Sequence, residues 1–160
     1  MMRVGLFSDS HGDTRALDDL LEKMGHIDAA CFMGDIARDA CHLEDRLSSM
    51  PGSPVLYAVK GNNDYASILP LDRLIELDGV RIYMTHGHTV VSLMSLAYRA
   101  AEKEAKIALF GHTHVPLCEV EQGVMLINPG SAGNYCRGGR ARASVLEIDR
   151  GKFRVHNVTL

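Results

Sequence analysis

The 160-residue sequence predicts a single α/β domain, residues 1–160, in which two mixed β-sheets pack together and helices flank them. In the first half, short apolar runs alternate with helical patterns, which is typical of parallel strands joined by crossover helices. In the second half, alternating runs meet at short turns that contain glycine, which is typical of hairpins. These strands are too many for one small sheet. We therefore expect two packed sheets.

The first half predicts strands at residues 3–8, 29–34 and 55–59. Between the first two, the segment "DTRALDDLLEKMG" predicts an amphipathic helix, because its apolar residues recur at helical spacing: Leu17, Leu20, Leu21 and Met24. Asp13 or Thr14 suits its N-cap, and Gly25 suits its C-terminal end. A second helix is expected over residues 40–49, before the third strand.

The second half contains three segments in which a glycine separates two runs of strand character: "IELDGVRIYM", "CEVEQGVMLI" and "VLEIDRGKFRV". Each predicts a hairpin. A helix over residues 90–105 interrupts them, with its apolar residues at helical spacing: Leu93, Leu96, Ala97 and Ala100.

Composition excludes several classes of function. The net charge of -3 argues against a broad surface for nucleic acid, although a nucleotide substrate stays compatible with it. No apolar run approaches transmembrane length, and the N-terminus lacks the pattern of a signal peptide. We therefore expect a cytoplasmic protein without a membrane partner. The cysteines show no C-x-x-C spacing and are expected to be packing residues: Cys31, Cys41, Cys118 and Cys136.

Polar residues with metal-ligating capacity follow five of the predicted strands, which is where open α/β sheets place their sites. Taken singly, each has another explanation, such as a helix cap, a turn residue or a core histidine. Five such strand ends flanked by glycine are harder to explain without a shared site. The segments are "SDSHGD" with Asp9 and His11, "MGDI" with Asp35, "KGNND" with Asn62, Asn63 and Asp64, "THGH" with His86 and His88, and "FGHTH" with His112 and His114, which follows the apolar, strand-like run "KIAL".

The order D-x-H, G-D, G-N-x-D, H-G-H and G-H-x-H over residues 9–114, followed by "NPGS" at 128–131, resembles the calcineurin-like metallophosphoesterases. It is most similar to their compact, single-domain prokaryotic phosphodiesterase branch. The resemblance implies a four-layer α/β/β/α sandwich. It also implies one metal bound by Asp9, His11 and His114, a second bound by Asn62, His86 and His112, and Asp35 bridging the two.

The resemblance further implies hydrolysis of a phosphate ester through in-line attack by a hydroxide that bridges the two divalent ions. Ligands of the carboxylate, amide and imidazole types suit Mn²⁺, Fe, Ni²⁺ or Zn²⁺, and the family favours manganese. With two ions, two carboxylates and a hydroxide, the centre keeps a charge of about +1, which a phosphodiester monoanion balances. A small phosphodiester is therefore the expected substrate.

The catalytic helpers implied by the same resemblance are Asn62, Asn63, Asp64 and His88. Asn63 is a departure, because many catalytic relatives carry a histidine there that protonates the leaving group. An amide donates a hydrogen bond but has no proton to release near neutral pH. His88 is a second candidate for that step, and a structural role for it stays open. We therefore expect slow turnover that favours good leaving groups.

The segment "NPGSAGNYCRGGRAR" offers further contacts for an anionic substrate. Asn128 and Ser131 could hold a phosphate oxygen or support the His112 loop. The arginines that could bind the distal part of the substrate are Arg137, Arg140 and Arg142. A solvated glycine-rich loop without substrate contact is the alternative.

The sequence is also compatible with two other functions. One is a phosphomonoesterase acting on a small metabolite or a phosphoprotein. The other is a non-catalytic interaction scaffold, as in the retromer subunit that shares this compact fold in eukaryotes. Exposed hairpin edges are also compatible with a homodimer.

Overall fold

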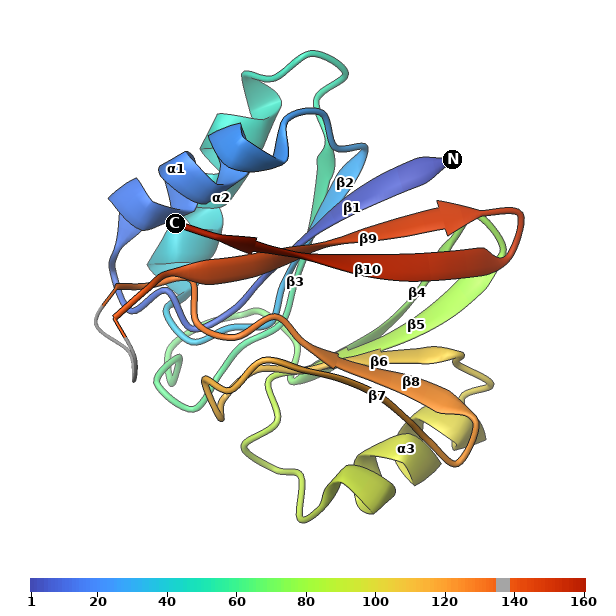
Figure 1. Cartoon of the computed structure of the whole chain (residues 1–160). Coiled ribbons are helices and arrows are strands. Elements are labelled where there is room, and N and C mark those ends of the chain that lie inside the picture. The colour runs from blue at the N-terminus through green and yellow to red at the C-terminus, as the bar shows by residue number, and fades with distance from the viewer. Residues whose placement is uncertain (135–138) are drawn as a thin grey trace.

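A computed structural model describes residues 1–134 and 139–160 of the chain (Figure 1). Its elements, in order, are β1 Met2–Phe7, α1 Thr14–Met24, β2 Ala29–Phe32, α2 Ala37–Ser48, β3 Val55–Ala58, β4 Asp72–Leu77, β5 Val80–Thr85, α3 Leu93–Glu102, β6 Ile107–Leu109, β7 Leu117–Glu121, β8 Val124–Asn128, β9 Arg142–Asp149 and β10 Lys152–Thr159. Among the described residues, none of these helices combines the length and apolar character that a bilayer crossing requires.

The strands form two mixed five-stranded sheets, in the orders β10-β9-β1-β2-β3 and β4-β5-β6-β8-β7. Within them, β1, β2 and β3 run parallel, and so do β5, β6 and β8. In Figure 1, α1 and α2 cover the outer side of the first sheet and α3 lies against the second. This is the predicted α/β/β/α arrangement, which is confirmed.

Three apolar clusters separate the four layers. The first joins α1 and α2 to the first sheet and includes Leu17 and Phe32. The second lies between the sheets and includes Leu6 and Ile82, and the third joins α3 to the second sheet through Leu96. The central strands are thus buried on both faces, which explains why they appear in the sequence as apolar runs rather than as an alternating pattern.

The three predicted hairpins are confirmed as β4–β5, β7–β8 and β9–β10. The first helix also begins as predicted, because Asp13 accepts a hydrogen bond from the backbone N–H of Ala16 at 3.0 Å. Gly25 ends it with a φ of 68°, which side chains disfavour.

Two helices differ in their bounds from the prediction. Helix α2 begins at Ala37, three residues before the predicted start at 40, because the Asp64 carboxylate accepts a hydrogen bond from the Ala37 N–H at 2.6 Å. Helix α3 spans only Leu93–Glu102 within the predicted 90–105. It begins at a capping box between Ser92 and Ser95, which holds the preceding residues out of the helix.

Candidate metal centre

The polar segments predicted from the sequence converge at the carboxyl ends of the parallel strands. Loops after β1, β2 and β3 come from the first sheet, and loops after β5, β6 and β8 come from the second. The structure brings together all seven side chains that the resemblance implies as metal ligands: Asp9, His11, Asp35, Asn62, His86, His112 and His114.

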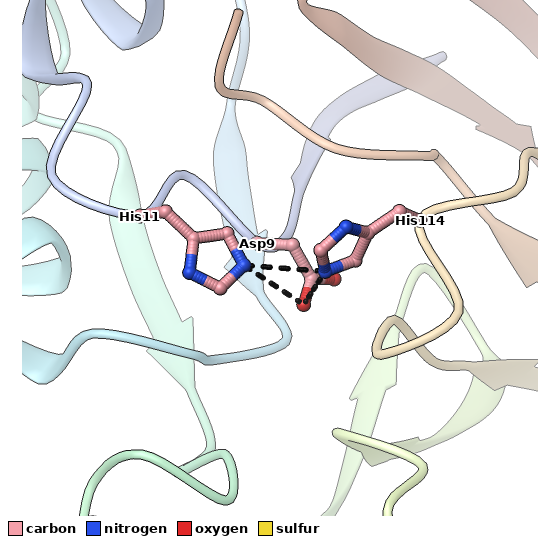
Figure 2. A group of neighbouring side chains, drawn as sticks. All are labelled: Asp9, His11 and His114. Atoms are coloured by element: carbon pink, nitrogen blue, oxygen red, sulfur yellow. Dashed lines mark hydrogen bonds and ion pairs between the residues drawn. The ribbon is translucent and has the colours of Figure 1, made fainter. Parts of the chain in front are cut away.

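One group of three potential ligands consists of Asp9, His11 and His114 (Figure 2). The Nε2 atoms of the two imidazoles lie 3.2 Å apart. The Oδ1 atom of Asp9 lies 3.2 Å from Nε2 of His114 and 4.0 Å from Nε2 of His11. The three side chains thus point at a common centre from loops distant in the sequence.

A second group consists of Asp9, Asp35 and His86. Nε2 of His86 lies 3.9 Å from Oδ1 of Asp9 and 3.0 Å from Oδ1 of Asn62. Asp9 belongs to both groups. Asp35 also lies between them, because its Oδ2 is 4.0 Å from Nε2 of His11.

The two histidines of "FGHTH" face different sides of this arrangement. The ring of His114 lies 5.0 Å from that of His11, whereas the ring of His112 lies 5.2 Å from that of His86. Both histidines have positive φ, so the segment is not extended and its side chains diverge. The division of these histidines between two metals, which the resemblance implies, stays a prediction.

The charge distribution fits a bound cation. Oδ1 of Asp9 is buried and has no hydrogen-bond partner within residues 1–134 and 139–160. Burying a charged oxygen without a hydrogen bond or a counter-ion costs free energy of folding. Its Oδ2 accepts hydrogen bonds from the Ser8 hydroxyl at 2.5 Å and the His112 N–H at 2.9 Å. The carboxylate is therefore oriented with its free oxygen toward three imidazole nitrogens, which suits a divalent ion.

A backbone contact fixes the ring of His86. Its Nδ1 lies 2.6 Å from the carbonyl oxygen of Met33, so the Nδ1–H donates to that carbonyl. Such a contact is typical of metal-binding histidines, because it leaves the Nε2 lone pair directed at the metal.

The backbone is strained where the potential ligands sit. Four of them have a positive φ: Asp9 at 53°, His11 at 49°, His112 at 65° and His114 at 58°. Ile36, next to Asp35, has a φ of 140°, which is rare for a β-branched residue. Strained conformations of this kind persist where surrounding contacts impose them, and they cluster at functional sites.

Asn128 and Ser131 act within the protein as loop supports. Asn128 donates hydrogen bonds to the Gly111 carbonyl at 2.8 Å and to the Thr113 hydroxyl at 3.0 Å. The hydroxyl of Ser131 donates to the carbonyl of Asp9 at 2.7 Å. The structure thus shows the support of the His112 loop that was one of the two predicted roles. Phosphate binding by these residues stays a prediction.

The predicted helpers lie beside the centre. The backbone N–H of Asn63 donates to Oδ1 of Asp35 at 2.8 Å, and its side-chain amide donates to Oδ2. Both oxygens of Asp64 accept from backbone, namely from the N–H groups of Gly61 and Ala37. The ring of His88 lies 5.5 Å from that of His86, and burial, followed by His86 and His112, lowers the pKa of His88.

One buried carboxylate near the centre was not among the residues predicted from the sequence. Asp39 of α2 is fully buried and accepts hydrogen bonds from the Ser10 hydroxyl at 2.6 Å and the Gly12 N–H at 2.7 Å, on either side of His11. The signal was present, because Asp39 precedes Leu43 by four positions and so falls on the apolar face of α2. A carboxylate on such a face calls for an internal partner.

The predicted distal arginines receive less support. Arg137 lies outside the described residues, and Arg140 is exposed. Arg142 begins β9, where its backbone N–H donates to the carbonyl of Ser131 at 2.7 Å. Substrate contacts by Arg137 and Arg140 stay predictions.

The family of the chain follows from a direct comparison with known families. The calcineurin-like phosphoesterase superfamily domain matches residues 2–151. The chain belongs to this superfamily. Among curated relatives, the probable metallophosphoesterase YsnB of Bacillus subtilis is 32% identical over 134 residues, covering 81% of this chain and 75% of the relative. Phosphodiesterase YfcE of Escherichia coli is 26% identical and covers 93% and 89%.

Solved structures agree with this assignment. A predicted phosphoesterase from Streptococcus pneumoniae superposes with a TM-score of 0.77 at 31% identity, covering 99% of this chain and 89% of that one. Vps29 of Entamoeba histolytica, solved with zinc, gives a TM-score of 0.74 at 21% identity and covers 99% of both chains. This second likeness shows a shared fold. The metallophosphoesterase fold and family are thus confirmed.

Proposed function

We propose that the protein is a phosphodiesterase that depends on two divalent metal ions. The observation that carries the proposal is the buried Oδ1 atom of Asp9, which has no hydrogen-bond partner within residues 1–134 and 139–160 and which three imidazole nitrogens surround at 3.2 to 4.0 Å. Such a concentration of ligand atoms about a buried carboxylate is typical of a metal site.

The residues divide into two ligand sets that share a carboxylate. Asp9, His11 and His114 would hold one ion; Asn62, His86 and His112 would hold the other, with Asp35 between them. Oxygen and imidazole ligands without thiolate suit Mn²⁺, and also Fe, Ni²⁺ or Zn²⁺, and we take Mn²⁺ as the first candidate. Two such ions would acidify a water molecule and neutralise the oxygens of the phosphoryl group.

The side chain of Asn63 limits the departure of the leaving group. Its amide orients Asp35 and can donate a hydrogen bond to a phosphoryl oxygen, but it cannot protonate a departing alkoxide. Esters of acidic alcohols, which leave without a proton, are therefore the better substrates.

The preference for diesters rests on two supports. The charge of about +1 at a centre with two ions, two carboxylates and a hydroxide matches a monoanion better than a dianion. The relative YfcE, which covers most of the chain, is named a phosphodiesterase. A monoesterase and a scaffold without activity are the competing functions, and the likeness to Vps29 is compatible with the second.

One set of assays separates the three functions. The protein is stripped with a chelator, restored with Mn²⁺, and given bis-p-nitrophenyl phosphate and p-nitrophenyl phosphate in parallel. We expect metal-dependent release of nitrophenolate that is faster from the diester. A faster reaction with the monoester would identify a monoesterase. No turnover with Mn²⁺, Ni²⁺, Fe²⁺ or Zn²⁺ would identify a scaffold. A small substrate, a cytoplasmic location and a homodimer accompany this proposal as predictions.

A further inference from the structure

A cleft of about 370 Å³ opens directly beside the candidate metal centre. Asn62, a predicted ligand, and His88 belong to both. The volume is in the range of small-molecule sites. The residues that line the cleft are Lys60, Gly61, Asn62, Asp64, Tyr65, Leu71 and His88.

The wall of this cleft away from the metal ligands is apolar and solvent-exposed. It comes from the loop between β3 and β4, in which Tyr65 is 91% exposed and Leu71 is 51% exposed. Ile68 of the same loop is fully exposed. Large apolar side chains gathered at a cleft, rather than scattered singly, mark a binding surface.

The loop that carries this wall is held at both ends. The N–H of Lys60 donates to the carbonyl of Pro70 at 2.9 Å, which joins the start of the loop to its end. Asp64 accepts the N–H groups of Gly61 and Ala37, so the loop is also attached to α2. Tyr65, the residue after Asp64, is therefore presented from an anchored position beside the metal ligands.

The charged groups of the cleft favour an anion. Within the described part of the chain, no carboxylate oxygen lies within 4.0 Å of the half-buried Lys60 ammonium, which is not engaged in an ion pair there. The Asp64 carboxylate is buried and faces backbone N–H groups rather than the opening. Lys60 thus contributes a positive charge beside an apolar wall.

We infer that the cleft binds a planar aromatic substituent of the phosphate ester, stacked against Tyr65 and packed on Leu71, while Lys60 attracts the anionic part of the same molecule. The substrate class is a phosphodiester in which one ester group carries an aromatic ring, as a nucleoside does. This inference rests on the proposed function, because the phosphate must lie at the metal centre for the ring to reach the cleft. The face of a tyrosine ring stacks on any such ring and makes no hydrogen bonds to the edge atoms that distinguish one base from another.

The experiment compares two phosphonates that differ only in their substituent, phenylphosphonate and methylphosphonate, by isothermal titration of the Mn²⁺-loaded protein. We expect phenylphosphonate to bind about tenfold more tightly, which is the scale of one stacking contact. Tyr65→Ala should reduce this ratio to about twofold while leaving the Kd of methylphosphonate unchanged. Tyr65→Phe should retain the ratio.

Two further variants complete the design. Tyr98→Ala removes a different exposed tyrosine, on α3 and outside the cleft, and should leave the ratio as in the wild type. Lys60→Gln should weaken the binding of both phosphonates by the same factor, because the lysine charge acts on the anionic group that the two ligands share. Equal binding of the two phosphonates by the wild type, or a ratio that survives Tyr65→Ala, would overturn the inference.

Failure of this inference and failure of the proposed function give different results. If the wild type binds the two phosphonates equally but hydrolyses bis-p-nitrophenyl phosphate, the cleft has no aromatic preference and the phosphodiesterase proposal stands. If the ratio holds and depends on Tyr65 while no ester is hydrolysed, the cleft binds as inferred and the catalytic proposal fails.

Discussion

His11 and His114 are 103 residues apart in the chain, yet their Nε2 atoms lie 3.2 Å from each other and face the same carboxylate oxygen of Asp9. Two neutral imidazoles gain little from such proximity unless a proton or a cation lies between them. The fold holds them there at the cost of left-handed backbone conformations at both residues. The relationship indicates that the loops are arranged around a ligand that stabilises them.

A bound metal should therefore stabilise the protein. Adding Mn²⁺ to the stripped protein should raise Tm, because an ion that binds only the folded state stabilises by about 2.7 kcal/mol at a hundredfold excess over its Kd. His114→Ala should reduce the rise, as followed by differential scanning calorimetry. His26→Ala, at a histidine that is 68% exposed and outside the centre, is the matched control and should keep the full rise. Equal shifts in the two variants would contradict the assignment of His114.

Asn63→His should restore a group that can protonate the leaving alcohol. We expect the kcat for a diester with an alkyl leaving group to increase by about 100-fold, the lower end of the range for general acid catalysis. Hydrolysis of bis-p-nitrophenyl phosphate should change much less, because nitrophenolate leaves without a proton. An unchanged rate with the alkyl ester would show that Asn63 does not limit that step.

Asp64→Asn should destabilise the protein even without metal. The carboxylate accepts hydrogen bonds from Ala37 and Gly61, and an amide keeps an acceptor for only one of them. The expected loss in free energy of unfolding is about 1.5–3 kcal/mol, as for a hydrogen bond to a charged group. Urea denaturation of the chelated protein measures it. Asp19→Asn, on the exposed side of α1, should change stability by less than about 0.5 kcal/mol; a similar loss in both variants would count against the capping role of Asp64.

Glu147 should make stability depend on acid pH. The hydrogen bond from Arg154 lowers the pKa of Glu147 below its usual value of 4.5, and His156 lowers it further. Arg3 also contacts this carboxylate, at 3.0 Å. Because the folded-state pKa is depressed, the stabilisation is present above pH 4.5 and is lost as the pH falls through the folded-state pKa.

The test compares Tm from pH 6 to pH 3 for the wild type, Glu147→Gln and Glu119→Gln. Glu147→Gln should lower Tm at pH 6, and its Tm should approach that of the wild type as the pH falls through the folded-state pKa of Glu147, because the protonated glutamate is then uncharged like glutamine. Glu119, which is exposed on β7, provides the control and should follow the wild type. A constant difference between Glu147→Gln and the wild type at every pH would contradict the ion-pair account.

Local pattern predicted the layers of the fold because strand and helix periodicities are recorded in adjacent residues. The hairpin glycines and the capping residue Asp13 act on their own neighbours, so these elements could be predicted. The start of α2 could not, because its cap, Asp64, comes 27 residues later. The contact of Asp39 with Ser10 is equally non-local, and it fixes the loop of His11 without any motif.

The convergence of the candidate metal ligands could be predicted for a different reason. Parallel strands bring the residues after their carboxyl ends to one edge, so residue types at strand ends suffice to nominate a site. The aromatic cleft could not be nominated in this way. Tyr65 and Leu71 are ordinary loop residues in sequence, and only the return of the loop to Lys60 shows that they line one wall.

The most direct test of the central claim is anomalous scattering from crystals of the protein soaked in Mn²⁺, recorded on both sides of the manganese absorption edge. The account predicts two manganese peaks, one beside His11 and His114 and the other beside His86 and His112, with Asp9 and Asp35 between them. A centre without manganese peaks, or a single peak bound by residues outside these two sets, would contradict it.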